Sequence, residues 1–313
     1  MNRLSTERYP AAEPDGEGTG KRALITGLGG FTGHYLAQEL AAAGYRVYGT
    51  AMPGQPAGPD TFNVDLCDRP AVAAMVEQVQ PDVVAHLAGI AFVGHANVDL
   101  IYRVNIVATR NLLEALAAQR HQPGAVLLAS SANIYGNASA GVIDESVQPA
   151  PANDYAVSKL AMEYMAALWN DKLPITIVRP FNYTGVGQDE NFLLPKIVAH
   201  FRKKAPVIEL GNTAIARDFS DVRMVAGCYR RLLARSPAGQ AFNVCSGQAH
   251  SLGSVLDLMA DIAGYRIDVQ VNPAFVRAKD VLTLVGSNAK LASVIGPVTP
   301  TPLADTLRWM YQA

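Results

Sequence analysis

The sequence is poor in cysteine and has no long apolar run. Its 313 residues include three cysteines, Cys67, Cys228 and Cys245, which lie far apart. An odd, scattered set fits neither a disulfide framework nor a zinc cluster, so we expect a reducing compartment and no metal site. No stretch approaches the roughly 18 to 20 apolar residues of a membrane span, and the N-terminus lacks the apolar core of a secretory signal. We therefore expect a cytoplasmic protein with no membrane contact.

The chain also lacks an excess of charge of either sign. Lys and Arg number 26 against 27 Asp and Glu, which gives a formal net charge of -1. Nucleic-acid binding needs a broad positive field, so no nucleic acid is expected as a partner. Hydrophobic residues make up 50% of the chain and charged residues 17%. This composition supplies enough apolar material for the core of an ordinary globular protein.

Strand-like and helix-like segments alternate between Lys21 and Pro180. The first 20 residues are polar and without periodicity, and they are predicted to form a disordered tail. Beyond them, runs such as RALIT and AVLLAS are separated by helical stretches of ten or more residues. This order is typical of a parallel sheet with helices on both faces. The prediction is an α/β fold whose residues 21–180 form a doubly wound Rossmann domain.

The pattern loosens after Pro180 into loops, shorter strands and helices near 192–203, 222–234 and 252–263. We expect residues 181–313 to form mainly a smaller, mixed α/β domain that binds substrate. Some of its segments should return to the Rossmann sheet, and the apolar strand at 241–245 is the candidate.

The spacing G-x-x-G-x-x-G occurs at Gly27, Gly30 and Gly33, directly after the first predicted strand. Glycines permit the sharp turn and the close approach of backbone to a pyrophosphate, which then lies at the N-terminus of the following helix. The order of strand, loop and helix is the context that gives this motif its meaning. It predicts a dinucleotide site that includes the three glycines, Phe31 and Thr32.

The second predicted strand ends in Gly49-Thr50-Ala51-Met52, which has no acid to bind an NAD ribose. It has no Arg or Lys for a 2′-phosphate either, so NADPH and NADH both remain possible, with a slight preference for NADPH.

Further along, Asp65 is a candidate partner for the adenine amino group, with Leu66 packed on the ring. A turn or a helix cap is an equally good interpretation of Asp65.

Tyr155 and Lys159 are four residues apart in a predicted helix, so they share one face. A neighbouring ammonium favours the phenolate, and we expect it to lower the pKa of Tyr155 toward neutral pH for acid and base work. Ser131 follows the strand AVLLAS, at the strand end where open α/β sheets bind ligands. It is expected to bind the substrate oxygen that Tyr155 protonates.

Together these motifs resemble the extended short-chain dehydrogenase/reductases that act on nucleotide sugars, the NAD-dependent epimerase/dehydratase family. The resemblance is carried by the glycine loop, His86-Leu87-Ala88-Gly89, Val104-Asn105, Ser130-Ser131…Tyr135-Gly136, Tyr155…Lys159 and Arg179-Pro180-Phe181-Asn182. It spans nearly the whole chain from Lys21. Within the family, the C-terminal half is most similar to the GDP-4-keto-6-deoxy-mannose reductases, through segments such as Arg217-Asp218-Phe219-Ser220-Asp221-Val222.

The resemblance implies roles for individual residues. Ser131, Tyr155 and Lys159 would form the catalytic triad, and Asn105 would support the lysine. Leu87, Ala88 and Gly89 would line the nicotinamide side of the cofactor site. The implied substrate contacts are Ser131, Asn133, Asn182, Arg217, Arg277 and Asp280, with the two arginines on the diphosphate. The segment Arg277-Ala278-Lys279-Asp280 departs from the subgroup's usual Arg-Pro-Ser-Glu.

The implied reaction is the reduction of the 4-keto group of a GDP-linked 4-keto-6-deoxy-sugar, a hexose or a heptose, in deoxysugar biosynthesis for a capsule or lipopolysaccharide. A 4,6-dehydratase is disfavoured, because Ala132 and Asn133 stand where it carries an acidic pair. An NAD-dependent nucleotide-sugar epimerase is the main alternative, since the triad alone does not separate net reduction from transient oxidation. A non-catalytic dinucleotide-binding regulator is a third interpretation, which the complete triad disfavours.

Two predicted helical stretches, around 97–119 and 153–170, carry more apolar residues than one sheet face needs. In similar enzymes the equivalent helices pair into a four-helix bundle between subunits, so the resemblance implies a homodimer. Internal burial of both faces is the alternative.

Overall fold

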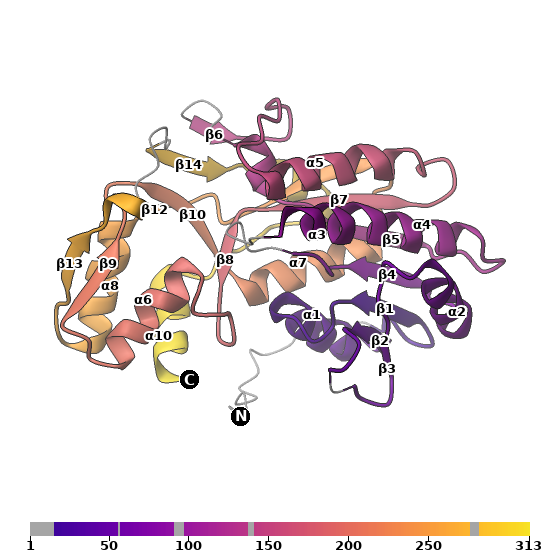
Figure 1. Cartoon of the computed structure of the whole chain (residues 1–313), viewed down its shortest axis with the longest axis horizontal. Helices are drawn as coiled ribbons and strands as arrows, with labels where there is room; N and C mark the ends of the chain where they lie inside the picture. Colours follow the sequence, from indigo (N-terminus) through magenta and orange to yellow (C-terminus); the bar gives the residue numbers. More distant parts are fainter. Residues whose placement is uncertain (1–15, 56, 91–96, 137–140, 276–281) are drawn as a thin grey trace.

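Seven parallel strands form the central sheet of the protein (Figure 1). The computed structural model describes residues 16–55, 57–90, 97–136, 141–275 and 282–313. The sheet has the order β11-β7-β5-β4-β1-β2-β3, and each neighbouring pair is parallel. Its strands are β1 (Arg22–Thr26), β2 (Arg46–Ala51), β3 (Thr61–Asn63), β4 (Val83–His86), β5 (Ala125–Ala129), β7 (Ile175–Pro180) and β11 (Gln240–Val244). The predicted doubly wound Rossmann sheet is confirmed.

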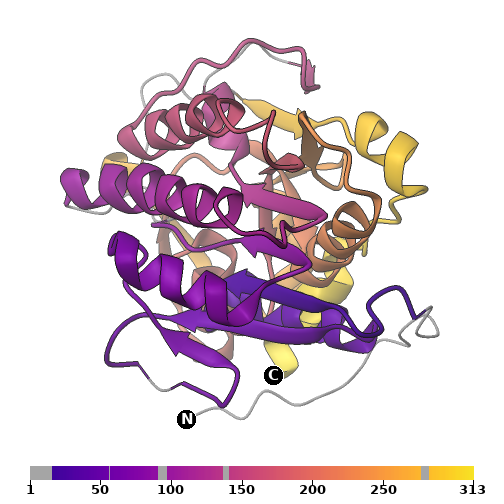
Figure 2. The same ribbon diagram turned by 90° about the vertical axis from the view of Figure 1, so that its right-hand side faces the viewer.

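Helices cover both faces of this sheet (Figure 2). Successive residues of a strand point to opposite faces, so Ile25 packs into one core and Leu24 into the other. The first core includes α1 (Phe31–Ala42), α7 (Val222–Arg235) and α9 (Ala289–Ile295). The second includes α2 (Arg69–Val79), α4 (Thr109–Ala117) and α5 (Asp154–Ala167). The short helix α3 (Val98–Tyr102) and the π-helical segment η1 (Arg103–Ala108) precede α4.

A second, mixed layer lies beside the central sheet (Figure 1). Its five-stranded sheet contains β6 (Gly141–Ile143), β8 (Asn182–Thr184), β10 (Ala216–Asp221), β12 (Ala249–Ser251) and β14 (Thr283–Gly286). A separate pair joins β9 (Val207–Leu210) to β13 (Asp268–Val271). A third core holds α6 (Leu193–Arg202), α8 (Leu252–Ala263) and α10 (Leu303–Gln312). The short 3-10 turns are η2 (Ala132–Tyr135) and η3 (Pro273–Phe275).

The two predicted domains exchange elements. Strand β11, which follows Pro180 in sequence, pairs with β7 and completes the central sheet, as the sequence predicted for the segment at 241–245. In the opposite direction, β6 precedes Pro180 but pairs with β14 in the second sheet. The two layers are therefore joined by strands as well as by the chain connection near residue 180.

Residues 16–20 of the predicted tail form turns against the central layer. The Gly18 N–H donates to the Ala43 carbonyl at 3.0 Å, and Glu17 lies 3.0 Å from Arg230 of α7. Residues 1–15 lie outside the described residues. Along the ranges that the structure describes, no helix has the length and apolar character needed to cross a bilayer.

Strands β1, β4, β5 and β7 end at the same edge of the sheet, because they run parallel. Strand β1 has β2 on one side and β4 on the other. After β3 the chain crosses back over β1 and adds β4 on its other side, so the sheet is wound in opposite directions on the two sides of β1. Open α/β sheets bind ligands at this point, beyond the carboxyl ends of the strands. The predicted glycine loop, the segment 87–89 and Ser131 directly follow β1, β4 and β5, so they lie at this edge.

A core substitution on β11 tests its place in the central sheet. Phe242 is fully buried, and Phe242→Ala is expected to lower the free energy of unfolding by about 3 to 5 kcal/mol, the usual cost of removing a buried ring. Met52 is 62% exposed, so Met52→Ala should change it by less than about 0.5 kcal/mol. Urea unfolding followed by circular dichroism measures both, and equal effects would contradict this assignment.

Candidate active site

The loop after β1 has the geometry that a pyrophosphate needs. Gly27 has φ +75°, and a Cβ atom there would lie 3.0 Å from the Ala88 nitrogen. A Cβ on Gly33 would collide with the Gly27 carbonyl, so helix α1 can lie this close only without a side chain. Gly30 caps α1 without any side-chain hydrogen bond, and a Cβ on Gly29 would meet no atom within 4 Å. The positive end of α1 thus faces open space that fits a pyrophosphate.

The loop after β4 runs beside the glycine loop. The Leu87 and Ala88 N–H groups donate to the carbonyl and the hydroxyl of Thr26, at 3.2 and 3.3 Å. His86 is buried between the hydroxyls of Thr26 and Thr109, at 2.7 and 2.8 Å from its two ring nitrogens. Burial lowers the pKa of His86 to about 3, so the ring is neutral and serves to connect β1, β4 and α4.

Gly89 brings this loop next to the predicted lysine. A Cβ on Gly89 would lie 3.0 Å from Asn105 Oδ1 and 3.2 Å from Lys159 Nζ. Asn105 is buried in η1, and its side chain accepts from the Ile90 N–H at 2.9 Å and donates to Ser158 Oγ at 2.9 Å. Asn105 therefore connects the loop after β4 to Ser158, the residue before Lys159. It lies in a π-helical segment, a feature often found at functional sites.

The Lys159 ammonium is buried inside the protein. Its Nζ donates to the Ala129 carbonyl at the end of β5, at 2.8 Å. Burial lowers the pKa of Lys159 to about 8, and the negative charge of Glu163 opposes this shift. The lysine thus carries its charge through most of the neutral range.

Tyr155 lies in the first turn of α5, one turn before Lys159, and Asn153 caps this turn by accepting from the Ala156 N–H at 2.9 Å. Burial raises the pKa of Tyr155 to about 12, and a hydrogen bond from Ser131 opposes the shift. The expected lowering of this pKa is therefore wrong for the free chain. The phenolate is disfavoured by burial, and Lys159 directs its ammonium to the Ala129 carbonyl instead.

Ser131 caps the short helix η2 and is buried. Its Oγ accepts from the backbone N–H of Asn133 at 3.1 Å and from the Asn133 side-chain amide at 3.0 Å. A serine hydroxyl has two acceptor sites and one donor. Both acceptor sites face Asn133, so the single O–H is left to point at Tyr155 or at an oxygen placed between them.

Asp65 forms a turn rather than a helix cap. Its Oδ1 accepts from the Cys67 N–H at 2.8 Å, and Asp68 is the residue that caps α2. The Leu66 side chain is 8% exposed and packs in the second core. Binding of adenine by Asp65 and Leu66 stays a prediction.

Thr32 and Phe31 contact a residue that the sequence did not single out. The Thr32 hydroxyl lies 2.7 Å from the hydroxyl of Tyr183 on β8, and the rings of Phe31 and Tyr183 stack with centroids 6.0 Å apart. These residues are 151 positions apart in sequence. The sequence predicted a role for the neighbouring Asn182, but no local pattern relates Tyr183 to α1.

Asn182 and Arg217, two of the predicted substrate contacts, lie on adjoining strands. Asn182 of β8 is paired with Phe219 of β10, two residues beyond Arg217, and its side chain donates to the Asp218 carbonyl at 3.3 Å. Asp218 is fully buried and accepts from the backbone and hydroxyl of Ser246, at 2.9 and 2.6 Å. This carboxylate anchors β10 beside the site. Arg277 and Asp280 lie outside the described residues.

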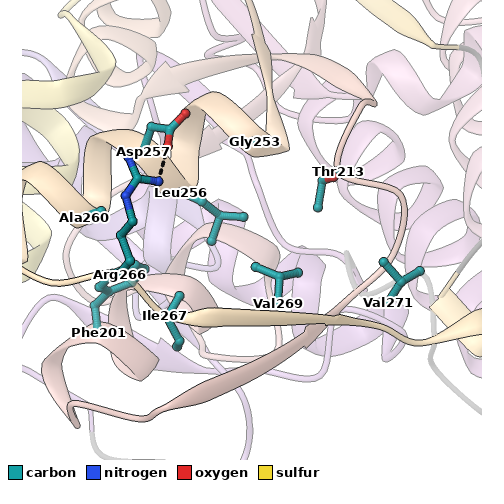
Figure 3. Close-up of a pocket in the computed structure, with 10 residues that line it drawn as sticks. All are labelled: Phe201, Thr213, Gly253, Leu256, Asp257, Ala260, Arg266, Ile267, Val269 and Val271. Atoms are coloured by element: carbon teal, nitrogen blue, oxygen red, sulfur yellow. Dashed lines mark hydrogen bonds and ion pairs between the residues drawn. The ribbon is translucent and has the colours of Figure 1, made fainter.

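One open pocket among the described residues lies away from the triad, in the second layer (Figure 3). It has a volume of about 320 Å³ and lies between α8 and β13. Its walls are mainly apolar, and Arg266 forms an ion pair of 2.9 Å with Asp257 at one end. None of the described site residues lines it.

The same described ranges contain no group of three His, Cys, Asp or Glu side chains placed to hold a metal ion.

Comparison with protein families matches residues 23–245 to the NAD dependent epimerase/dehydratase family. Among curated proteins, the chain is 34% identical over 278 residues to GDP-6-deoxy-D-talose 4-dehydrogenase from Aggregatibacter actinomycetemcomitans, covering 88% of this chain and 91% of that protein. It is 33% identical over 299 residues to GDP-6-deoxy-D-mannose reductase from Pseudomonas aeruginosa, covering 92% and 95%.

Two solved structures are similar over nearly their whole length. One comes from Burkholderia cenocepacia and is provisionally described as an epimerase; it has a TM-score of 0.90 and 54% identity, covering 94% of this chain and 98% of that one. The other is RMD from Pseudomonas aeruginosa complexed with NADPH, with a TM-score of 0.82 and 32% identity, covering 93% and 98%.

The close contact at Gly89 allows a direct test of the cofactor loop. Gly89→Ala places a Cβ against Asn105 and Lys159, so the loop must move and the affinity for NADPH is expected to fall about tenfold, or 1.4 kcal/mol. At Gly124 an added Cβ meets only the Asp82 carbonyl, at 3.8 Å, and Gly124→Ala is the control. Titration of NADPH fluorescence measures both affinities. Unchanged binding by Gly89→Ala would show that this loop does not contact the cofactor.

Proposed function

The chain belongs to the NAD dependent epimerase/dehydratase family, and from this premise we propose that it reduces the 4-keto group of a nucleotide-linked 4-keto-6-deoxy-sugar. The observation that carries the proposal is the buried, protonated Tyr155 beside Ser131. A hydroxyl with a pKa near 12 keeps its proton at neutral pH and serves as the acid that a forming alkoxide requires.

The residues divide the work at the carbonyl. Ser131 donates its single O–H to the carbonyl oxygen, because Asn133 fills both of its acceptor sites. Tyr155 gives its proton to the same oxygen as the charge develops. Lys159 holds a positive charge one turn away and stabilises the phenolate that this proton transfer leaves behind. The reduced nicotinamide, when bound, supplies a hydride to the carbonyl carbon.

The cofactor is NADPH or NADH, as the family and the complex of the Pseudomonas neighbour with NADPH support. The end of β2 gives little basis for choosing between them. Its Thr50 hydroxyl accepts from the Gly27 N–H at 3.1 Å and so serves the glycine loop, while Met52 is exposed. NADPH is slightly favoured, because the end of β2 carries no acid to bind the ribose of NADH.

The proposed substrate carries GDP and a 6-deoxy sugar, a hexose or a heptose. Both curated relatives are named for GDP-linked 6-deoxyhexoses, and one of them for oxidation at position 4. Asn133, Asn182 and Arg217 contact this substrate from η2 and from the second layer, and Arg277 and Asp280 complete the contacts to the nucleotide. The product enters deoxysugar biosynthesis for a surface polysaccharide such as a capsule or lipopolysaccharide.

An epimerase is the alternative function, and the provisional description of the Burkholderia neighbour as an epimerase supports it. The experiment uses purified protein with NADPH or NADH and a GDP-4-keto-6-deoxy-hexose generated in place. A reductase consumes reduced cofactor in proportion to substrate. Interconversion of sugar nucleotides without net loss of cofactor absorbance would establish the epimerase, and no reaction of either kind would favour a heptose substrate.

Substitution of the proton donor tests the mechanism. Tyr155→Phe is expected to lower kcat by about 10² to 10⁴, the usual contribution of a general acid, while the Kd of NADPH stays unchanged. Tyr311→Phe, on α10 of the second layer, makes the same chemical change away from the site and should retain wild-type turnover. Full activity of Tyr155→Phe would rule out this residue as the donor.

We also propose that the chain forms a homodimer through a four-helix bundle. Apolar side chains stand exposed along α3, η1 and α5 and at the residue that caps α5; they are Leu100 (38%), Val107 (44%), Val157 (38%), Tyr164 (68%) and Leu168 (77%). Their spacing of seven and four residues puts them on one face of each helix. Such an apolar face is typical of a surface covered by another subunit.

Sedimentation velocity tests the dimer. The wild-type chain is expected to sediment as a dimer, and the double variant Tyr164→Glu/Leu168→Glu as a folded monomer, because two buried charges would oppose association. Val142→Glu changes an equally exposed apolar residue on β6 and should leave the dimer intact. A monomeric wild-type protein would overturn the proposal.

A further inference from the structure

An ion pair between Glu163 and Arg179 lies directly behind the triad. Arg179 of β7 donates from Nε to Glu163 Oε1 at 3.0 Å and from Nη2 to Oε2 at 2.7 Å. The two side chains are only 10% and 11% exposed. Removing two charges from water is costly, and the attraction within a buried pair often does no more than offset that cost. The pair is therefore poorly explained by stability alone.

The remaining hydrogen bonds of the pair reach both ends of the segment that carries Ser131. The Ser130 hydroxyl donates to Glu163 Oε1, and Arg179 Nη1 donates to the Tyr135 hydroxyl at 2.9 Å. Ser131 and η2 lie between these two points. Since α5 also carries Tyr155, one carboxylate on this helix fixes the serine segment relative to the tyrosine.

The same network continues to the last strand of the central sheet. Tyr135 is fully buried and donates from its hydroxyl to Asn243 Oδ1 at 2.8 Å. Asn243 of β11 donates from its side chain to the Ile143 carbonyl of β6 at 3.0 Å, and its backbone N–H donates to Glu145 at 2.7 Å. The far end of η2 is thus held by groups that are themselves fixed by two sheets.

Glu163 also acts on the lysine of the triad. Tyr155, Lys159 and Glu163 recur every four residues, on one face of α5. Glu163 on the same helix is the titratable group that acts on Lys159, and the Lys159 charge in turn helps to lower the pKa of His86 on β4. Only Glu163 contributes a negative charge, and it raises the pKa of Lys159 against the effect of burial.

We propose that Glu163, clamped by Arg179, is a positioning residue of this enzyme that holds the Ser131 hydroxyl in place beside Tyr155. Its negative charge also raises the pKa of Lys159 against the effect of burial. The inference rests on the proposed function for the reaction whose rate is followed, although the contacts that carry it do not depend on the identity of the sugar.

The first test is Glu163→Gln, which keeps the shape of the side chain and removes its charge. We expect kcat to fall about 10- to 100-fold, since misplacement of a catalytic group by about 1 Å has costs of this size. The KM for the nucleotide sugar and the Kd for NADPH should change less than threefold. The fall of kcat/KM at alkaline pH should move to lower pH, because Lys159 loses its anionic neighbour.

Glu163→Asp separates the two effects. The shorter carboxylate retains the charge near Lys159 but not the reach to Ser130, so the pH profile should resemble that of the wild type while kcat remains low. Asp221→Asn is the matched control. Asp221 is buried and pairs with Arg223 at 2.9 and 2.6 Å on the other side of the sheet. Its loss should lower the melting temperature without moving the pH profile.

A purely structural role for Glu163 would give the pattern of the control, a lower melting temperature with unchanged kcat and pH profile at low temperature. That result would overturn the proposal.

Ionisation of Lys159 can also be followed without substrate, by NMR of the protein with ¹³C-labelled lysine, with the signal assigned through Lys159→Met. A pKa lowered by Glu163→Gln would support the inference even if the wild-type enzyme acts on a different sugar. An unchanged pKa would contradict it.

Discussion

A buried ammonium, that of Lys159, is the constraint on which the arrangement of this site depends. A lysine in the protein interior keeps its charge only where acceptors and a counter-charge surround it. Here the Ala129 carbonyl accepts from Nζ, and Glu163 supplies the negative charge one turn further along α5. These requirements fix α5 against the end of β5. Tyr155, carried on the same helix, is thereby placed beside Ser131, the second residue after β5.

Burial has opposite effects on the two residues of the Tyr-x-x-x-Lys motif. It raises the pKa of Tyr155 and lowers that of Lys159, because in each case it disfavours the charged form. At neutral pH the free chain therefore holds a protonated phenol beside a charged lysine. The tyrosine can therefore donate a proton, while the lysine can stabilise the phenolate that remains.

The sequence was sufficient where geometry is local. The glycine loop, the four-residue spacing of Tyr155 and Lys159, and the alternation of strands with helices each predict structure within a few residues, and all are present in the fold. It was insufficient where distant residues meet. Tyr135 and Asn243 are 108 residues apart, and a single sequence carries no signal for their contact. The direction of the Tyr155 pKa shift failed for the same reason, because burial is a property of the whole fold.

Asn243 shows why the catalytic and the substrate-binding halves cannot be treated as separate bodies. It lies on β11 of the central sheet, yet its side chain joins Tyr135 behind the triad to the Ile143 carbonyl of β6 in the second sheet. Two hydrogen bonds therefore join β6 to the helix η2 that Ser131 caps. The position of Ser131 therefore depends on contacts from both layers, and not only on the strand β5 that precedes it.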